Sequence, residues 1–287
     1  MEVPERNSAG RAPGLSLTRL LASNPRQEAI LDFLSKTLSR SRTHRLLWLA
    51  YLAGAAAVLL NSSLINGAIF LKGKGDAMRA LRFVVLFWPQ ACSIILVSGM
   101  RHVFLIPCEL PANWIFRSTE SLGRADWMTA VERFVLARAV LPWCLLAYPA
   151  TAYAYGAAAA ARVTVLQALV SLAAFELVFD GWQKLPFTCA HIPGKRSPVG
   201  IFGAYLAVLG MLVPMLTVFI AASGAFWFVF PVWLFAFGGV WLWLRRARRE
   251  LWSEGALAYD AVPDVASGIG ISGIRHGAIP PPFASSR

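Results

Sequence analysis

The chain alternates between long apolar stretches and shorter polar segments, and this pattern predicts a helical membrane protein. A spanning helix needs about 20 mainly apolar residues, because each residue advances about 1.5 Å across a hydrocarbon core of about 30 Å. Stretches of about this length occur at 46–71, 83–106, 134–156, 163–182, 200–222 and 225–244. We therefore expect an all-α bundle of about six transmembrane helices within residues 46–250, the last two forming a tight antiparallel hairpin.

A helical periodicity of a different kind precedes the first apolar stretch. Its apolar positions, which share one face opposite Lys and Arg, are Ile30, Leu31, Phe33, Leu34 and Leu38. Asn24 can cap this helix, and Pro25 suits its first position. Residues 24–45 are predicted to be an amphipathic helix that lies along the inner membrane surface. An ordinary helix that only leads into the first span fits the same pattern.

The two ends of the chain have no such periodicity. The stretch after residue 253 is small, polar and proline-rich, and closes with GAIPPPFASSR. We expect 1–23 to be a disordered N-terminal segment and 251–287 a disordered cytoplasmic tail. The glycines of SGIGISGIRHG are not followed by the lysine and serine or threonine of a phosphate loop.

Composition agrees with the membrane class. The 287 residues are 57% hydrophobic and 15% charged, with a mean hydropathy of +0.57, whereas soluble domains carry about 25% charged residues. The net charge of +12 would suggest nucleic acid as a partner of a soluble protein. Basic residues at the ends of membrane spans explain it here, and no basic stripe with interleaved aromatics lies in a soluble segment. We therefore expect a lipid bilayer, and no nucleic acid, as partner.

The distribution of Lys and Arg predicts the orientation. With both termini in the cytoplasm, 21 of these residues lie inside and five outside, as the positive-inside rule requires. The basic segment 72–82 is the exception. Making 46–71 a re-entrant hairpin would bring 72–82 inside, but it would put the RRARR run at 245–249 outside, so we reject that alternative. The prediction is a multi-pass protein of the inner membrane.

The motifs of common membrane enzymes are missing. The sequence contains no HExxH and no GxSxG. Its four cysteines are widely separated, without a CxxC. We predict no cofactor and no catalytic residue from these patterns.

The stretch KLPFTCAHIPGKRSP, at 184–198, is the most varied polar segment. Its Cys189 and His191, together with His102 and Cys108 of another loop, could ligate zinc, although the spacing is not that of a standard site. We predict no metal here.

Two other interpretations of this stretch concern its basic residues and its prolines. Lys184, Lys195 and Arg196 could bind lipid phosphate at the inner surface. Pro186, Pro193 and Gly194 could instead make a compact turn that docks on the bundle or on a partner. We favour the turn.

Two charged residues fall inside predicted spans. Glu176 lies about 9 Å, and Arg138 about 6 Å, from the inner ends of their helices. Buried charges are usually paired, so these matched depths predict an Arg138–Glu176 ion pair. A structural pair is favoured over a proton or substrate relay, because the spans offer no other ionisable group near the midplane.

In its overall plan, the chain resembles the permease subunits of type 2 ATP-binding-cassette exporters. The shared features are six spans, two inner termini, an amphipathic helix and a polar loop between spans two and three. The loop residues Glu109, Trp114, Arg117 and Glu120 would then contact a separate ATPase, as the resemblance implies. The nearly absent connection between the last two spans departs from those permeases, which often have short re-entrant helices there. The stretches HRLLWLAYL, ELPANWIF and KLPFTC are similar to multi-pass bacterial membrane proteins without an assigned activity.

Three functions are therefore open. The first is a permease-like exporter subunit coupled through its cytoplasmic loops. The second is a membrane scaffold or assembly factor that presents the same loops to another protein, and the third is an enzyme that uses Cys189 and His191. A homo- or hetero-oligomer is compatible with the first two.

Overall fold

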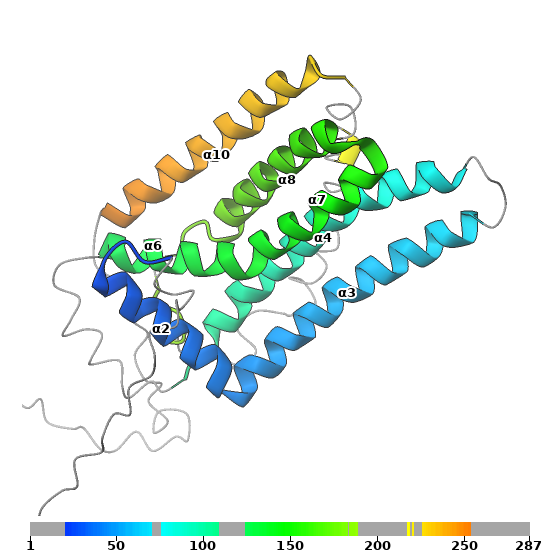
Figure 1. Cartoon of the computed structure of the whole chain (residues 1–287). Helices are drawn as coiled ribbons and strands as arrows, with labels where there is room; N and C mark the ends of the chain where they lie inside the picture. The colour runs from blue at the N-terminus through cyan, green and yellow to red at the C-terminus, as the bar shows by residue number, and fades with distance from the viewer. Residues whose placement is uncertain are drawn as a thin grey trace, which may run out of the picture.

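A computed structural model describes residues 21–70, 76–108, 124–182, 184–188, 217, 218, 220 and 226–253. Every regular element in these ranges is helical, and no strand occurs among them (Figure 1). The elements are α2 (Pro25–Arg40), α3 (Arg42–Phe70), α4 (Asp76–Leu105), α6 (Arg124–Val135), η3 (Leu136–Val140), α7 (Leu141–Tyr155), α8 (Ala157–Val178) and α10 (Val229–Ser253).

Four helices of the described part are long and apolar enough to cross a membrane. They cover Arg42–Ser62, Leu81–Leu105, Ala125–Tyr155 and Ala157–Val178, and they correspond to the first four predicted stretches. α10 covers the sixth. The fifth, 200–222, lies outside the described residues apart from Thr217, Val218 and Ile220, so the count of six stays a prediction.

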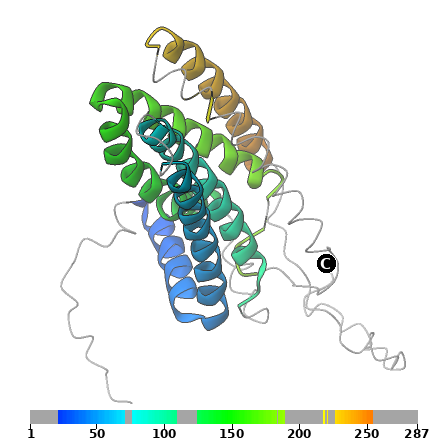
Figure 2. The same ribbon diagram turned by 90° about the vertical axis from the view of Figure 1, so that its right-hand side faces the viewer.

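The long helices lie side by side and form a bundle (Figures 1 and 2). At one end α2 lies beside α6, close to the last turns of α8 and α10 (Figure 1). We call this the α2 end. At the opposite end α7 and α8 are joined by the single residue Gly156, whose φ of +86° is a conformation that favours glycine. We call this the Gly156 end. α4 is central, since most of its span is buried, whereas most of α3 faces outward.

The predicted amphipathic helix is present as α2. The Asn24 side chain accepts a hydrogen bond from the Gln27 backbone N–H at 2.8 Å, and Pro25 occupies the first turn, as the pattern predicts. The helix ends at Arg40, and α3 begins at Arg42, earlier than the predicted start of the first span.

The apolar face of α2 is buried in protein. Its residues Ile30, Leu31, Leu34 and Leu38 are at most 5% exposed and join the main core with Met128 and Val131 of α6. This arrangement differs from a helix whose apolar face rests on lipid. The apolar face of α6 supplies the partner surface that the sequence pattern of α2 could not identify.

A π-helical turn interrupts the third span. Leu141 donates its backbone N–H to the Leu136 carbonyl, five residues earlier, and Pro142 follows at once. Proline has no N–H to offer the preceding turn, so a wider turn at this point avoids a missing α-helical bond. α6, η3 and α7 therefore form one continuous but irregular helix.

The domain boundaries at the two termini remain predictions. Residues 1–20 and 254–287 lie outside the described ranges, and α10 extends to Ser253.

Candidate functional site

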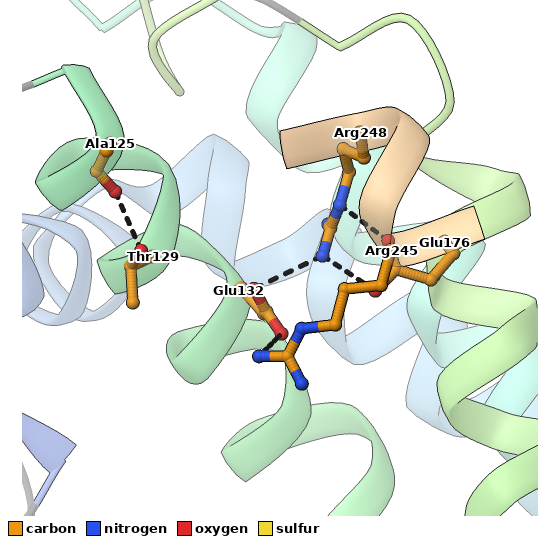
Figure 3. Close-up of polar contacts among 6 residues, drawn as sticks. All are labelled: Ala125, Thr129, Glu132, Glu176, Arg245 and Arg248. Carbon is orange, nitrogen blue, oxygen red and sulfur yellow. Dashed lines mark hydrogen bonds and ion pairs between the residues drawn. The ribbon is translucent and has the colours of Figure 1, made fainter. Parts of the chain in front are cut away.

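Four charged side chains from three helices meet at the α2 end (Figure 3). The guanidinium of Arg248, on α10, lies between two carboxylates. Its Nη2 is 3.1 Å from Glu132 Oε2 on α6 and donates to Glu176 Oε1 on α8 at 2.8 Å, and its Nε is 2.5 Å from Glu176 Oε2. Arg245 Nη2 lies 3.2 Å from the other oxygen of Glu132. We call these four residues the ion-pair cluster.

Three of the four members of the ion-pair cluster are buried, and its charges balance. Glu132, Glu176 and Arg248 are 6%, 3% and 3% exposed, and two arginines face two carboxylates. Burying charges is costly, but mutual attraction and several hydrogen bonds offset that cost when the geometry is good. Arg248 also lies over the Phe175 ring, 4.6 Å from its centroid. The cluster therefore joins α6, α8 and α10 and resists their separation.

Burial also acts on the protonation of Arg248. Desolvation lowers the pKa of this guanidinium, while the carboxylates of Glu132 and Glu176 raise it. The two carboxylates thus favour the charged form of Arg248 that burial disfavours.

The predicted Arg138–Glu176 pair is corrected by this geometry. Both oxygens of Glu176 contact Arg248. Arg138 is exposed, and its guanidinium lies 5.5 Å from the ring centroid of Phe134 on its own continuous helix. Matched depth in the membrane was a necessary condition for the pair. It was not sufficient, because depth says nothing of the direction in which each side chain leaves its helix.

The arginine run of α10 was interpreted only as an orientation signal, and its part in the site was missed. Arg245 and Arg248 turn into the ion-pair cluster, whereas Arg246 and Arg249 are exposed. Residues three apart share a helix face, so the spacing within RRARR was the available signal. Glu132 was missed as well, since it was counted as part of a polar loop.

A second polar network joins α2 to α6. Asp126 Oδ1 accepts hydrogen bonds from Asn24 Nδ2 at 2.9 Å and Gln27 Nε2 at 3.0 Å. Arg133 Nη1 donates to Ser23 Oγ at 2.6 Å and to Gln27 Oε1 at 2.9 Å. We call this set the α2–α6 network. It holds α2 on the opposite side of α6 from α10 (Figure 1).

The described part of the KLPFTCAHIPGKRSP stretch packs against the bundle. Phe187 has a φ of +66°, which is costly for a residue with a large side chain. Its N–H donates to the Phe104 carbonyl at the end of α4, and its carbonyl accepts from the Cys108 N–H. Its ring is 1% exposed and packs edge-on against His44 and Phe104, with centroids 4.8 and 5.4 Å away.

Residues 184–188 therefore form a turn that packs against the bundle, which we call the docked turn. Pro193 and Gly194 lie outside the described residues, so the compact turn over the whole stretch stays a prediction. Lys184, the first residue of the docked turn, is half-buried.

The remaining predicted site residues lie outside the described ranges. They are Glu109, Trp114, Arg117, Glu120, Cys189, His191, Lys195 and Arg196. Of the other two residues considered for zinc, Cys108 is exposed and His102 Nδ1 lies 2.8 Å from Tyr51 Oη. Within the described ranges no three His, Cys, Asp or Glu side chains are grouped as metal ligands.

The chain matches no protein-family model, no curated protein and no solved structure.

Proposed function

We propose that the protein is a six-span, permease-like subunit of the inner membrane that couples to a separate ATPase at its α2 end. The observation that carries this proposal is the attachment of α6 to α8 and α10 by the ion-pair cluster. α6 begins directly after the segment that contains Glu109, Trp114, Arg117 and Glu120, the predicted coupling residues. A movement of that segment would act first on α6.

The contacts of α6 suit it to transmit such a movement. The α2–α6 network holds one side of the helix, and the ion-pair cluster holds another. Pulling buried opposite charges apart is costly, so α8 and α10 would follow α6 rather than detach from it. The continuous helix through η3 would carry the same movement into α7.

The course of the chain supports the six-span topology. Residues 184–188 pack at the α2 end, whereas Ile220 belongs to a core cluster with Ala154 and Val163, near the Gly156 end. These positions lie at opposite ends of the bundle, and the sequence between them contains 200–222, which is apolar and long enough for one crossing. The basic segments that flank the α2 end favour a cytoplasmic location for that end.

The proposal is tested by purifying the full chain from native membranes in mild detergent and identifying proteins that accompany it by mass spectrometry. We expect a stoichiometric ATPase. Alanine at Glu109, Trp114 and Arg117 should abolish stimulation of that ATPase without reducing membrane insertion. Ala158→Glu, at an exposed position near the opposite end, serves as the control and should leave stimulation unchanged.

The outcomes separate the three functions considered from the sequence. Unchanged stimulation in the loop variants would overturn the coupling role. A stoichiometric partner without ATPase activity would replace the permease by a scaffold or assembly factor. Full cellular function after Cys189→Ala would exclude an enzyme that depends on this thiol.

A further inference from the structure

Uncharged polar side chains are buried in the middle of the bundle. Gln90 and Ser93 on α4 and Gln167 on α8 are each 1% exposed. Gln90 and Ser93 lie about 14 and 18 Å along the Leu81–Leu105 span, and Gln167 about 15 Å along Ala157–Val178. All three are therefore far from both membrane surfaces.

Most of their hydrogen-bonding capacity is unused. Within the described part of the chain, neither amide atom of Gln90, nor Ser93 Oγ, nor Gln167 Oε1 has a hydrogen-bond partner. A buried polar atom without a partner destabilises a fold. Leucine would fill the Gln90 position without that cost, so the polar side chain calls for an explanation other than packing.

The α4 backbone is irregular at the same level. Pro89 offers no N–H, which deprives the Val85 carbonyl of its α-helical donor. Gln167 Nε2 reaches across from α8 to this carbonyl at 3.5 Å. This contact places Gln167 beside the turn of α4 that precedes Gln90. In the turn that follows Gln90, Ala91 and Ile94 pack against Ala174 of α8. α8 therefore follows α4 past the Gln90 level.

α7 is irregular at the same level, although it packs on the Trp88 face of α4, which is about 200° around the helix from the Gln90 face. Trp88 of α4 packs on Trp143 of α7, with ring centroids 5.7 Å apart, so Pro142 and the end of η3 lie near the Gln90 level. π-helical turns occur frequently at functional sites, and prolines in membrane helices leave carbonyls that other groups can satisfy.

The region lacks charge. No Asp, Glu, Lys, Arg or His occurs within 83–100, 139–155 or 163–175. An ion would meet no counter-charge there and would be costly to hold. Amide and hydroxyl groups offer both donors and acceptors, so they suit a solute that is itself neutral and carries both.

From these observations we propose that α4 and α8 enclose a site for a small neutral solute with hydrogen-bond donors and acceptors, contacted by Gln90 and Ser93. The class comprises small amides and polyols. The inference rests on the proposed transport function and supplies its substrate class. The helices are closed around the site in this structure, since both residues are 1% exposed, and solute enters when α8 parts from α4.

The test compares two adjacent positions of α4 that face different neighbours. Cys92 is fully buried and its Sγ donates to the Ala55 carbonyl of α3, so it points away from the site and is the control. One full-length protein retains only Cys92, with Cys108, Cys144 and Cys189 replaced by alanine. A second carries Ser93→Cys in the same background with Cys92→Ala. Both are treated with N-ethylmaleimide in native membranes.

We expect the thiol at position 93 to react at least about tenfold faster than Cys92, because alkylation needs access to water and to the reagent. Equal rates, whether both slow or both fast, would overturn the site. Acetamide should slow the reaction at position 93, whereas acetate, similar in shape but charged, should not. Equal protection by the two, or protection by neither, would overturn the solute class.

Gln90→Leu gives a second, independent measurement. We expect a raised melting temperature, because an unpartnered amide is removed, together with loss of the acetamide protection at position 93. Retained protection would remove Gln90 from the site. None of these measurements involves an ATPase. Fast labelling at position 93 in a protein without an ATPase partner would therefore support the solute site and contradict the exporter function. Coupling to an ATPase without fast labelling at position 93 would support the exporter function and contradict the solute site.

Discussion

At the scale of single residues, Arg248 decides how three helices are joined. It contacts Glu132 and Glu176 at once, and its side chain is 4% exposed. Removing one member of a buried ionic group leaves the others unpaired in a medium that solvates them poorly. Replacing one charged member of the ion-pair cluster should therefore lower the stability of the protein strongly. Replacing Arg248 and both carboxylates together should lower it much less.

Arg248→Met should destabilise the protein by about 3–5 kcal/mol, measured as thermal unfolding in detergent. Arg138→Met is the matched control, since Arg138 is exposed and contributes a ring contact worth about 0.5–1 kcal/mol. Adding Glu132→Gln and Glu176→Gln to Arg248→Met should recover much of the loss. Equal effects of the two methionine variants would contradict the assignment of Arg248 as the partner of Glu176.

Phe187 is the second residue on which stability depends strongly, because its ring is buried while its backbone is strained. Phe187→Ala should cost about 3–5 kcal/mol of local stability and expose the turn. The measurement is the rate of tryptic cleavage after Lys184 in purified protein. Phe187→Gly should be about 1 kcal/mol less damaging than alanine, because glycine tolerates the positive φ.

The control for that experiment is Phe228→Ala, since Phe228 is 60% exposed. It should leave cleavage after Lys184 unchanged. Cleavage that does not respond to Phe187→Ala either would mean that the ring does not hold the turn in place.

At the scale of elements, α2 is held by polar contacts as well as by its apolar face. Asp126 receives hydrogen bonds from Asn24 and Gln27, both at the first turn of α2. The helix begins where this network lies, so the network positions the N-terminal turn of α2 on α6.

Asp126→Ala should therefore increase amide hydrogen exchange in the first turns of α2, because two donors lose their acceptor. The expected loss is about 1–3 kcal/mol of local stability, the range for removing the partner of a buried polar group, since Gln27 is buried and Asn24 is partly buried. Asp32→Asn is the control, since Asp32 makes only an exposed pair with Lys36 at 3.1 Å, a kind worth about 0.3–0.5 kcal/mol. Unchanged exchange in the Asp126 variant would show that apolar packing alone holds α2.

At the scale of the whole molecule, the bundle has two distinct ends. The α2 end gathers α2, α6, the docked turn and the basic last turns of α10, whereas the Gly156 end has a one-residue connection (Figure 1). The proposed orientation places the α2 end in the cytoplasm, where a partner ATPase would have to be.

The orientation can be checked with an impermeant thiol reagent on intact cells. Native Cys108, exposed at the α2 end, should be protected until the cells are lysed. Ala158→Cys, at an exposed position near the Gly156 end, should react in intact cells when it is the single accessible cysteine. The reverse pattern would invert the topology and remove the coupling proposal.

The class of the protein and much of its local structure follow from the sequence alone. Apolar length, the cap at Asn24 and the helical face of Ile30, Leu34 and Leu38 are properties of neighbouring residues, so periodicity and hydropathy are enough to predict them. The starts and ends of helices shift by a few residues, and the apolar class of the spans does not change.

The partners of those elements were decided only by the tertiary structure. Glu176 and Arg248 are 72 residues apart, and no local pattern says which of several helices lies beside α8. The same holds for the α2 face, which meets α6 rather than lipid, and for Phe187, whose strained backbone is maintained by contacts from α3 and α4. Hydropathy acts through the average environment of each segment, whereas pairing depends on the direction and depth of individual side chains once all the helices have packed.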